Sequence, residues 1–143
     1  MSKYEGKEAV AVIARDDAFD KLADTKALQA RLESLPDDRR NQLQGLKFDD
    51  DAISLASPVG ELRFVAQEKL RPERIVFAAD GSPIPLSVII NLSEKSATET
   101  GVSVVIDADL PLMLKAMVGS KLKDAVDQIS LGIASAISNA DIQ

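Results

Sequence analysis

The residues of this chain that can carry chemistry are mainly carboxylates, because the sequence contains no histidine and no cysteine. Histidine is the commonest general base and a frequent metal ligand, and cysteine supplies thiol nucleophiles and zinc ligands. Acid–base chemistry would therefore depend on Asp or Glu, and the acidic run Asp49-Asp50-Asp51 is the most conspicuous group. Hard cations prefer such oxygens, but the run lacks the spacing of a calcium loop. We interpret it as a hairpin turn between two short strands.

Glu68 is the strongest candidate for an acid, a base or a ligand contact. It shares the strand parity of Leu62, Phe64 and Ala66, so an unbroken strand would turn its carboxylate toward the covered face of a sheet. A buried carboxylate needs a compensating charge, and Arg74, near the start of the next predicted strand, can provide one. The alternative interpretation is a glutamate at the solvated end of the sheet, without a function.

A long C-terminal helix dominates the elements that must position these residues. Apolar side chains recur every three or four residues between residues 110 and 139, which predicts an amphipathic helix about 45 Å long, with Asp109 as its N-cap. Gly119 predicts either a bend or a division into two helices. Met113 and Met117, one turn apart, suit the mouth of an adaptable pocket. We expect the following residues to be buried against a sheet: Leu122, Val126, Ile129 and Ile133.

Strands in hairpin order can provide that sheet. Residues 3–14 are predicted to form a first strand, with Tyr4, Val10 and Val12 on one face, and two or three short helices follow before residue 45. From residue 46 the period-two alternation of apolar residues predicts six further strands, at residues 46–48, 52–56, 62–67, 74–79, 86–92 and 102–108. Hairpin-connected strands pair antiparallel and usually leave one face wet. The predicted fold class is α+β, with a seven-stranded curved antiparallel sheet wrapped around the long helix in a single domain, residues 1–143.

The composition narrows the possible partners. The chain is 45% hydrophobic but only 3% aromatic, so its core must be mainly aliphatic. Its net charge of −6 argues against nucleic-acid binding. The charged N-terminal residues are unlike a signal peptide, and no stretch approaches ~18 consecutive apolar residues, so we expect no integral membrane segment and a cytoplasmic location.

Five short stretches carry a resemblance to a known superfamily: residues 20–24 (DKLAD), 57–60 (SPVG), 74–77 (RIVF), 80–85 (DGSPIP) and 117–119 (MVG). With the order of the predicted elements, they resemble the helix-grip fold of the START-like, or SRPBCC, superfamily, which includes polyketide cyclases and plant pollen-allergen proteins. The closest likeness is to small bacterial members, and it covers nearly the whole chain. Members typically hold apolar ligands between the curved sheet and the long helix. The resemblance therefore implies a ligand-binding protein, with no catalytic signature to transfer.

We accordingly predict a protein that binds a lipid-like or other apolar small molecule, rather than an enzyme, with no catalytic residue, no cofactor and no metal. The predicted ligand-binding residues are Phe64, Glu68, Arg74, Phe77, Ile90 and Met117. Two alternatives remain open: an interaction module with a fully packed core, and a cyclase- or dehydratase-type enzyme that uses a pocket carboxylate such as Glu68. Aliphatic residues line pockets and fill cores alike, so composition does not choose among the three. No oligomeric state is predicted.

Overall fold

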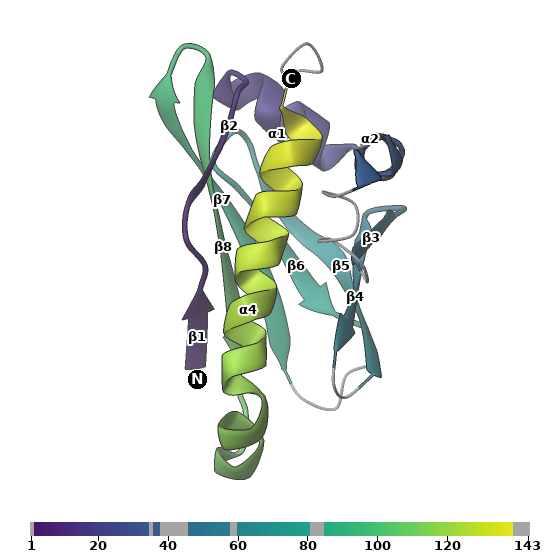
Figure 1. Cartoon of the computed structure of the whole chain (residues 1–143), viewed down its shortest axis with the longest axis vertical. Helices are drawn as coiled ribbons and strands as arrows, with labels where there is room; N and C mark the ends of the chain where they lie inside the picture. The colour runs from purple at the N-terminus through teal and green to yellow at the C-terminus, as the bar shows by residue number, and fades with distance from the viewer. Residues whose placement is uncertain (1, 35, 38–45, 58–59, 81–84, 139–143) are drawn as a thin grey trace.

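The computed structural model describes residues 2–34, 36–37, 46–57, 60–80 and 85–138. A curved antiparallel sheet wraps around one long helix, α4 (Leu112–Ile137), and two short helices, α1 (Arg15–Ala23) and α2 (Thr25–Glu33), lie at one end of it (Figure 1). Among the described residues, no helix has the length and apolar character needed to cross a membrane.

The sheet has eight strands, and all of their pairings are antiparallel. The strands are β1 (Ser2–Glu5), β2 (Ala9–Ala11), β3 (Leu46–Asp49), β4 (Ala52–Ser57), β5 (Gly60–Leu70), β6 (Arg74–Ala79), β7 (Leu86–Ser96) and β8 (Glu99–Ala108). Their order across the sheet is β1-β8-β7-β6-β5-β4-β3, and β2 also pairs with β8. The predicted α+β class and hairpin order are confirmed; the count rises from seven to eight because the first predicted strand is divided in two.

The division of the first strand follows from a close approach to α4. A Cβ atom on Gly6 would lie 3.0 Å from the backbone carbonyl carbon and oxygen of Val126, and the next residue, Lys7, donates its backbone N–H to Asp127 Oδ1 at 2.8 Å. At Lys7 the backbone hydrogen-bonds α4 instead of β8. The alternation of side chains between the two faces of the sheet is therefore different in β1 and β2. Val10 is 50% exposed. The prediction that Val10 shares the face of Tyr4 is therefore wrong.

The two short helices lie where they were expected. Asp24 accepts the backbone N–H of Ala27 at 3.2 Å and so caps α2. The hydroxyl of Thr25 instead accepts the backbone N–H of Asp51 at 2.9 Å and donates to the carbonyl of Asp49, which ties α2 to the β3–β4 turn. A third helix, expected over residues 37–44, falls almost entirely on residues outside the described ranges.

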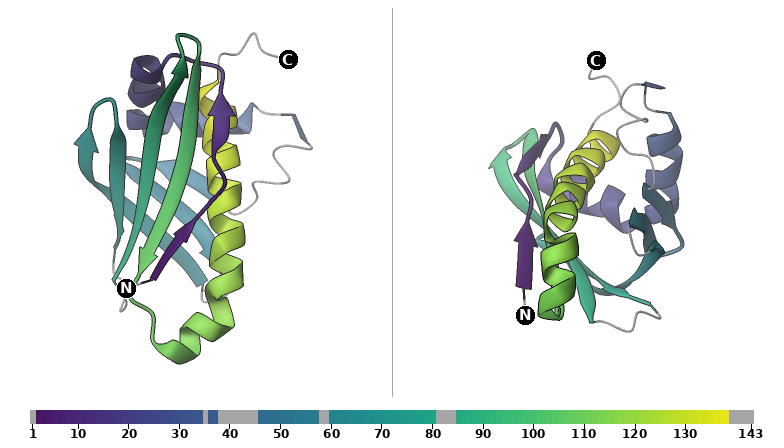
Figure 2. Two further views of the ribbon diagram at one scale, coloured as in Figure 1. Left: turned by 90° about the vertical axis from the view of Figure 1, so that its left-hand side faces the viewer. Right: turned by 60° about the horizontal axis from the view of Figure 1, so that its bottom comes forward.

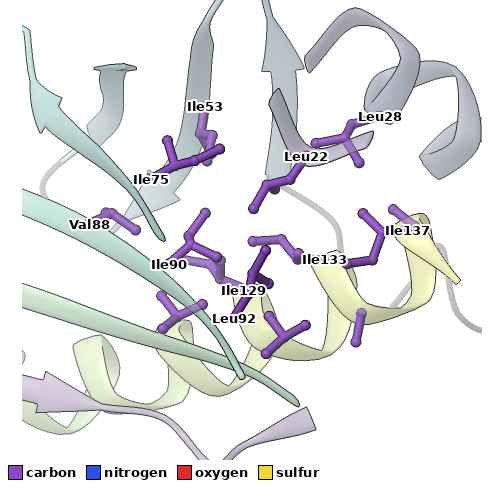
Figure 3. Packing of buried hydrophobic residues seen from close by; sticks show 14 of the residues in the cluster. Leu22, Leu28, Ile53, Ile75, Val88, Ile90, Leu92, Ile129, Ile133 and Ile137 are labelled. Atoms are coloured by element: carbon purple, nitrogen blue, oxygen red, sulfur yellow. The ribbon is translucent and has the colours of Figure 1, made fainter. Parts of the chain in front are cut away.

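The core lies between α4 and the concave face of the sheet. Cross-strand neighbours such as Ile75 and Ile90 present their side chains to this face, and α4 meets them with Ile129 and Ile133 (Figure 3). The predicted helix stripe is confirmed over its second half, where Val126, Ile129 and Ile133 are at most 1% exposed. Apolar side chains alternate along the strands and recur about every 3.6 residues along the helix. These two periodicities give the sheet and α4 one apolar surface each, and the two surfaces pack together.

Hydrogen bonds to the small helices anchor the C-terminal end of α4. Arg31 of α2 donates from Nη2 to the carbonyl of Ser138 at 2.6 Å and from Nε to the carbonyl of Ala136. The guanidinium satisfies carbonyls that a helix end leaves free, and its charge complements the negative end of the helix dipole. The backbone N–H of Val12 donates to Ser138 Oγ at 3.1 Å. This half of α4 is therefore fixed to the rest of the domain.

Candidate functional site

The two halves of α4 differ sharply in burial. Its first turns extend past the ends of the neighbouring strands (Figure 2), and Leu112, Met113 and Met117 are 83%, 77% and 66% exposed. None of the described side chains between residues 112 and 125 is buried, although Leu114 and Leu122 are half-buried. The start of α4 therefore presents apolar side chains that the described protein does not cover.

The helix begins later than predicted and has no break. Asp109 does not cap it: the N-cap is Pro111, without a side-chain hydrogen bond, and the helix runs unbroken from Leu112 through Gly119. The backbone N–H of Asp109 donates to the carbonyl of Pro85 at 3.1 Å, so this residue still belongs to the end of the sheet. The prediction of an Asp109 cap is therefore wrong, and of the two alternatives for Gly119 the division into two helices is excluded.

Three of the predicted ligand-binding residues share the concave face. Phe64 on β5, Phe77 on β6 and Ile90 on β7 are each at most 1% exposed. Phe77 lies opposite Val88, which lies opposite Ile106, so the apolar surface continues across three strands without a polar interruption. A ligand held between the sheet and α4 would contact these side chains.

Glu68 and Arg74 lie elsewhere, and the reason is a β-bulge. Ala66 pairs with Phe77 but Glu68 pairs with Val76, so the ladder shifts by one residue between them and the parity of β5 reverses. The prediction that Glu68 faces the covered side is wrong. Its carboxylate does meet Arg74, at 3.3 Å, but the two side chains are 52% and 48% exposed. Such an exposed pair contributes little to stability and does not reach the concave face.

Met117 lies on the outer side of α4. Nine residues separate it from the buried Val126, which is two and a half turns of an α-helix. The sulfur-bearing side chain therefore points away from the sheet, and Met113, one turn earlier, is similarly exposed.

Tyr4 is a residue that the sequence reasoning missed as a site residue. It pairs with Ile106 across the ladder, and its ring packs against the hydrophobic core cluster. Its hydroxyl oxygen is buried and has no hydrogen-bond partner among the described residues. The ring lies beside Gly119, whose added Cβ would be 3.5 Å from the hydroxyl oxygen. One signal was available beforehand: Tyr4 is the only tyrosine in the sequence.

The acidic run at residues 49–51 forms the β3–β4 turn, as predicted. Asp51 has a φ of 47°, a left-handed conformation that suits a turn and that aspartate tolerates. Lys26 pairs with Asp50 at 3.2 Å, and Lys69 pairs with Asp51 at 2.9 Å. These ion pairs, like the hydroxyl of Thr25, hold the turn against its neighbours, so structural contacts account for the acidic run.

A second charged contact ties α1 to the turn between β5 and β6. Arg71 donates from Nε and Nη2 to the two carboxylate oxygens of Asp20, at 2.9 and 3.1 Å. This hydrogen bonding, reinforced by the guanidinium charge, lowers the pKa of Asp20 below its ordinary value of 3.8. The same contact raises the pKa of Arg71. The pair is solvent-exposed and serves to position α1 at the end of the sheet.

Comparison with solved structures identifies the fold. Norcoclaurine synthase from Thalictrum flavum superposes with a TM-score of 0.68 at 8% identity, covering 95% of this chain and 86% of that chain. A protein from Thermus thermophilus gives 0.66 at 10% identity, over 95% and 97%. A START superfamily protein from Mycobacterium smegmatis gives 0.52 at 11% identity, over 90% and 94%. The chain has the START-like helix-grip fold.

By sequence, no protein-family model and no curated protein matches the chain. The START-like fold was nevertheless the one that the order of the predicted elements and the five short stretches resembled. At identities near 10% the superposition carries the fold and not the side chains of a site. The concave face, α4 and Tyr4 must therefore be interpreted from this chain's own residues.

Proposed function

We propose that this protein binds an apolar small molecule between the concave face of the sheet and the first half of α4. The observation that carries the proposal is the contrast between the two halves of the helix. The second half is buried and hydrogen-bonded to α2, whereas no described side chain between residues 112 and 125 is buried: Leu112 is exposed and Leu122 is only half-buried. Exposed apolar side chains of this kind at the end of an apolar face favour a ligand-binding role.

The START-like fold supports the same proposal. One of its structural neighbours, norcoclaurine synthase from Thalictrum flavum, is known in complex with dopamine and hydroxybenzaldehyde, and it superposes on 95% of this chain with a TM-score of 0.67 at 9% identity. That protein holds small aromatic molecules. The apolar surface that Phe64, Phe77 and Ile90 form in the present chain favours an apolar molecule, such as one with a lipid-like chain.

The proposal contains no catalytic step, and it revises the predicted ligand contacts. Glu68 and Arg74 pair with each other on the surface, outside the concave face. Met117 points away from the sheet and is no longer among the proposed contacts. Phe64, Phe77 and Ile90 remain the proposed lining.

An environment-sensitive fluorescent fatty acid, titrated into the purified protein, tests the proposal. Saturable uptake is expected in the wild-type protein, and Phe77→Trp should abolish it, because the larger side chain would occupy the position proposed for the ligand. Val76→Trp is the matched control, because Val76 is the next residue of β6 and belongs to the opposite face. It should bind the probe as the wild type does, and circular dichroism should show the same fold in both variants.

Overpacking a core commonly costs about 1–3 kcal/mol, so Phe77→Trp carries a risk of unfolding. Ile90→Phe, on the neighbouring strand, provides a second plug if that happens. Absence of saturable uptake by the wild type, together with absence of any retained small molecule in native mass spectrometry, would refute the proposal. An interaction module with a packed core would then be the better interpretation.

A further inference from the structure

The hydroxyl of Tyr4 is a buried donor that the described protein leaves without a partner. Tyr4 is partly buried and packs against the apolar core cluster. Folded proteins pair the great majority of their buried polar atoms, and an unpaired one is costly. A phenylalanine would fill the same place without that cost, so the hydroxyl requires a partner other than the described residues.

The position of Tyr4 places this donor in the proposed ligand site. Tyr4, Ile106, Val88 and Phe77 lie opposite one another on four successive strands of the sheet, so they form one row across its concave face. Neighbouring strands are about 4.8 Å apart, which puts Tyr4 roughly 14 Å from Phe77 along the row. The three other members of the row are apolar, and Tyr4 is its only polar member.

Gly119 leaves room beside the hydroxyl. A Cβ added to this glycine would lie 3.5 Å from Tyr4 Oη and 3.6 Å from the ring carbon Cε1, which are ordinary contact distances. A methyl-sized group therefore fits between α4 and the end of the tyrosine. The helix presents no side chain of its own at the point where the donor is buried.

On the basis of the proposed function, we propose that Tyr4 is the polar contact of the ligand site. Its hydroxyl donates a hydrogen bond to an oxygen atom at one end of the ligand, and the rest of the ligand lies along the apolar row toward Phe77. The ligand class is then amphipathic: an extended apolar body with one terminal carboxylate, carbonyl or hydroxyl oxygen. A fatty acid or a fatty alcohol fits this description, whereas a hydrocarbon does not.

Two fluorescent probes share the same apolar chain, but one ends in a carboxylate and the other in a methyl group. Comparing their affinities distinguishes a hydrogen bond to Tyr4 from burial of the apolar chain. Tyr4→Phe removes only the hydroxyl and should weaken binding of the carboxylate probe about tenfold, the size of one good hydrogen bond. Binding of the methyl probe should not change. Ile106→Val is the matched control, because it trims the neighbouring residue of the same row and should affect both probes alike.

The sequence allows a direct spectroscopic check, because Tyr4 is its only tyrosine and it has no tryptophan. The near-ultraviolet difference spectrum of the wild-type protein therefore reports on this one side chain apart from the weak bands of phenylalanine. Addition of an unlabelled fatty acid should shift the tyrosine band, and an alkane of equal length should not.

The two proposals fail in different ways. If the wild-type protein binds neither probe, the proposed function is refuted, and this inference with it. If both probes bind but Tyr4→Phe leaves the ratio of their affinities unchanged, a water molecule satisfies the hydroxyl. In that case the inference is refuted and the proposed function stands.

Discussion

Replacing Ile129 by Ala should lower the free energy of unfolding by about 2–4 kcal/mol. Ile129 is 1% exposed and lies on the side of α4 that faces the sheet (Figure 3). The substitution removes three buried carbon atoms at ~0.8 kcal/mol each, which amounts to about 2.4 kcal/mol before any cavity forms. Incomplete collapse of the core adds to that loss. The higher helix propensity of alanine returns a few tenths of a kcal/mol.

Urea denaturation, followed by the helical circular dichroism signal, measures this loss as a lower midpoint with an unchanged slope. Leu131→Ala is the matched control, because Leu131 lies two residues further along the same helix and is 48% exposed. It should cost less than about 1 kcal/mol, since little buried surface is removed. A loss below about 0.5 kcal/mol for Ile129→Ala, or equal losses for the two variants, would show that the buried side of α4 has been misassigned.

Two glycines that contact or belong to α4 should respond in opposite ways to alanine. Gly6→Ala should destabilise the folded protein by about 1–3 kcal/mol, because the added Cβ would lie 3.0 Å from the backbone of Val126. Gly119→Ala should stabilise it by up to ~1 kcal/mol, because alanine has the higher helix propensity and the added Cβ makes only ordinary contacts. Thermal melts of both variants check this, and a shift in the same direction would contradict it. The contact between Asp20 and Arg71 should give a pH-dependent contribution. Because the pKa of Asp20 is lower in the folded protein, the stability it adds is present above its ordinary value of 3.8 and is lost as the pH falls through the lowered pKa. Asp20→Asn should therefore be less stable than the wild type at neutral pH but not at strongly acidic pH.

The sequence predicted the fold well because periodicity is a collective signal. Alternation in β6 and β7 placed Phe77 and Ile90 on the concave face, and the spacing of Val126, Ile129 and Ile133 placed them opposite. One irregular residue does not erase such a pattern, since each element contributes several apolar positions. The resemblance to the START-like superfamily had the same basis, in the order of the elements.

The errors arose where a single residue or contact decides the outcome. A β-bulge adds one residue to β5 between Ala66 and Glu68, so Glu68 faces the opposite side of the sheet from the one predicted. The local sequence does not indicate this bulge. The close approach of Gly6 to α4 divided the first strand, which depends on a partner far away in the sequence. Asp109 looked like a helix cap, but its backbone hydrogen bond to Pro85 keeps it at the end of the sheet. Tertiary contacts of this kind override local propensity.

The structure separates what stabilises this domain from what would define its ligand. The second half of α4 is held by Arg31, by Asp127 and by the buried stripe that ends at Ile137, and these contacts do not involve the first turns. Substitutions in the first turns should therefore cost the fold little, so that their effect on the proposed binding can be measured separately from stability. Solved structures near 10% identity share the START-like fold over at least 90% of this chain. In the ligand site that we propose, ligand preference would rest on a few side chains of the apolar row, and the polar member of that row is Tyr4.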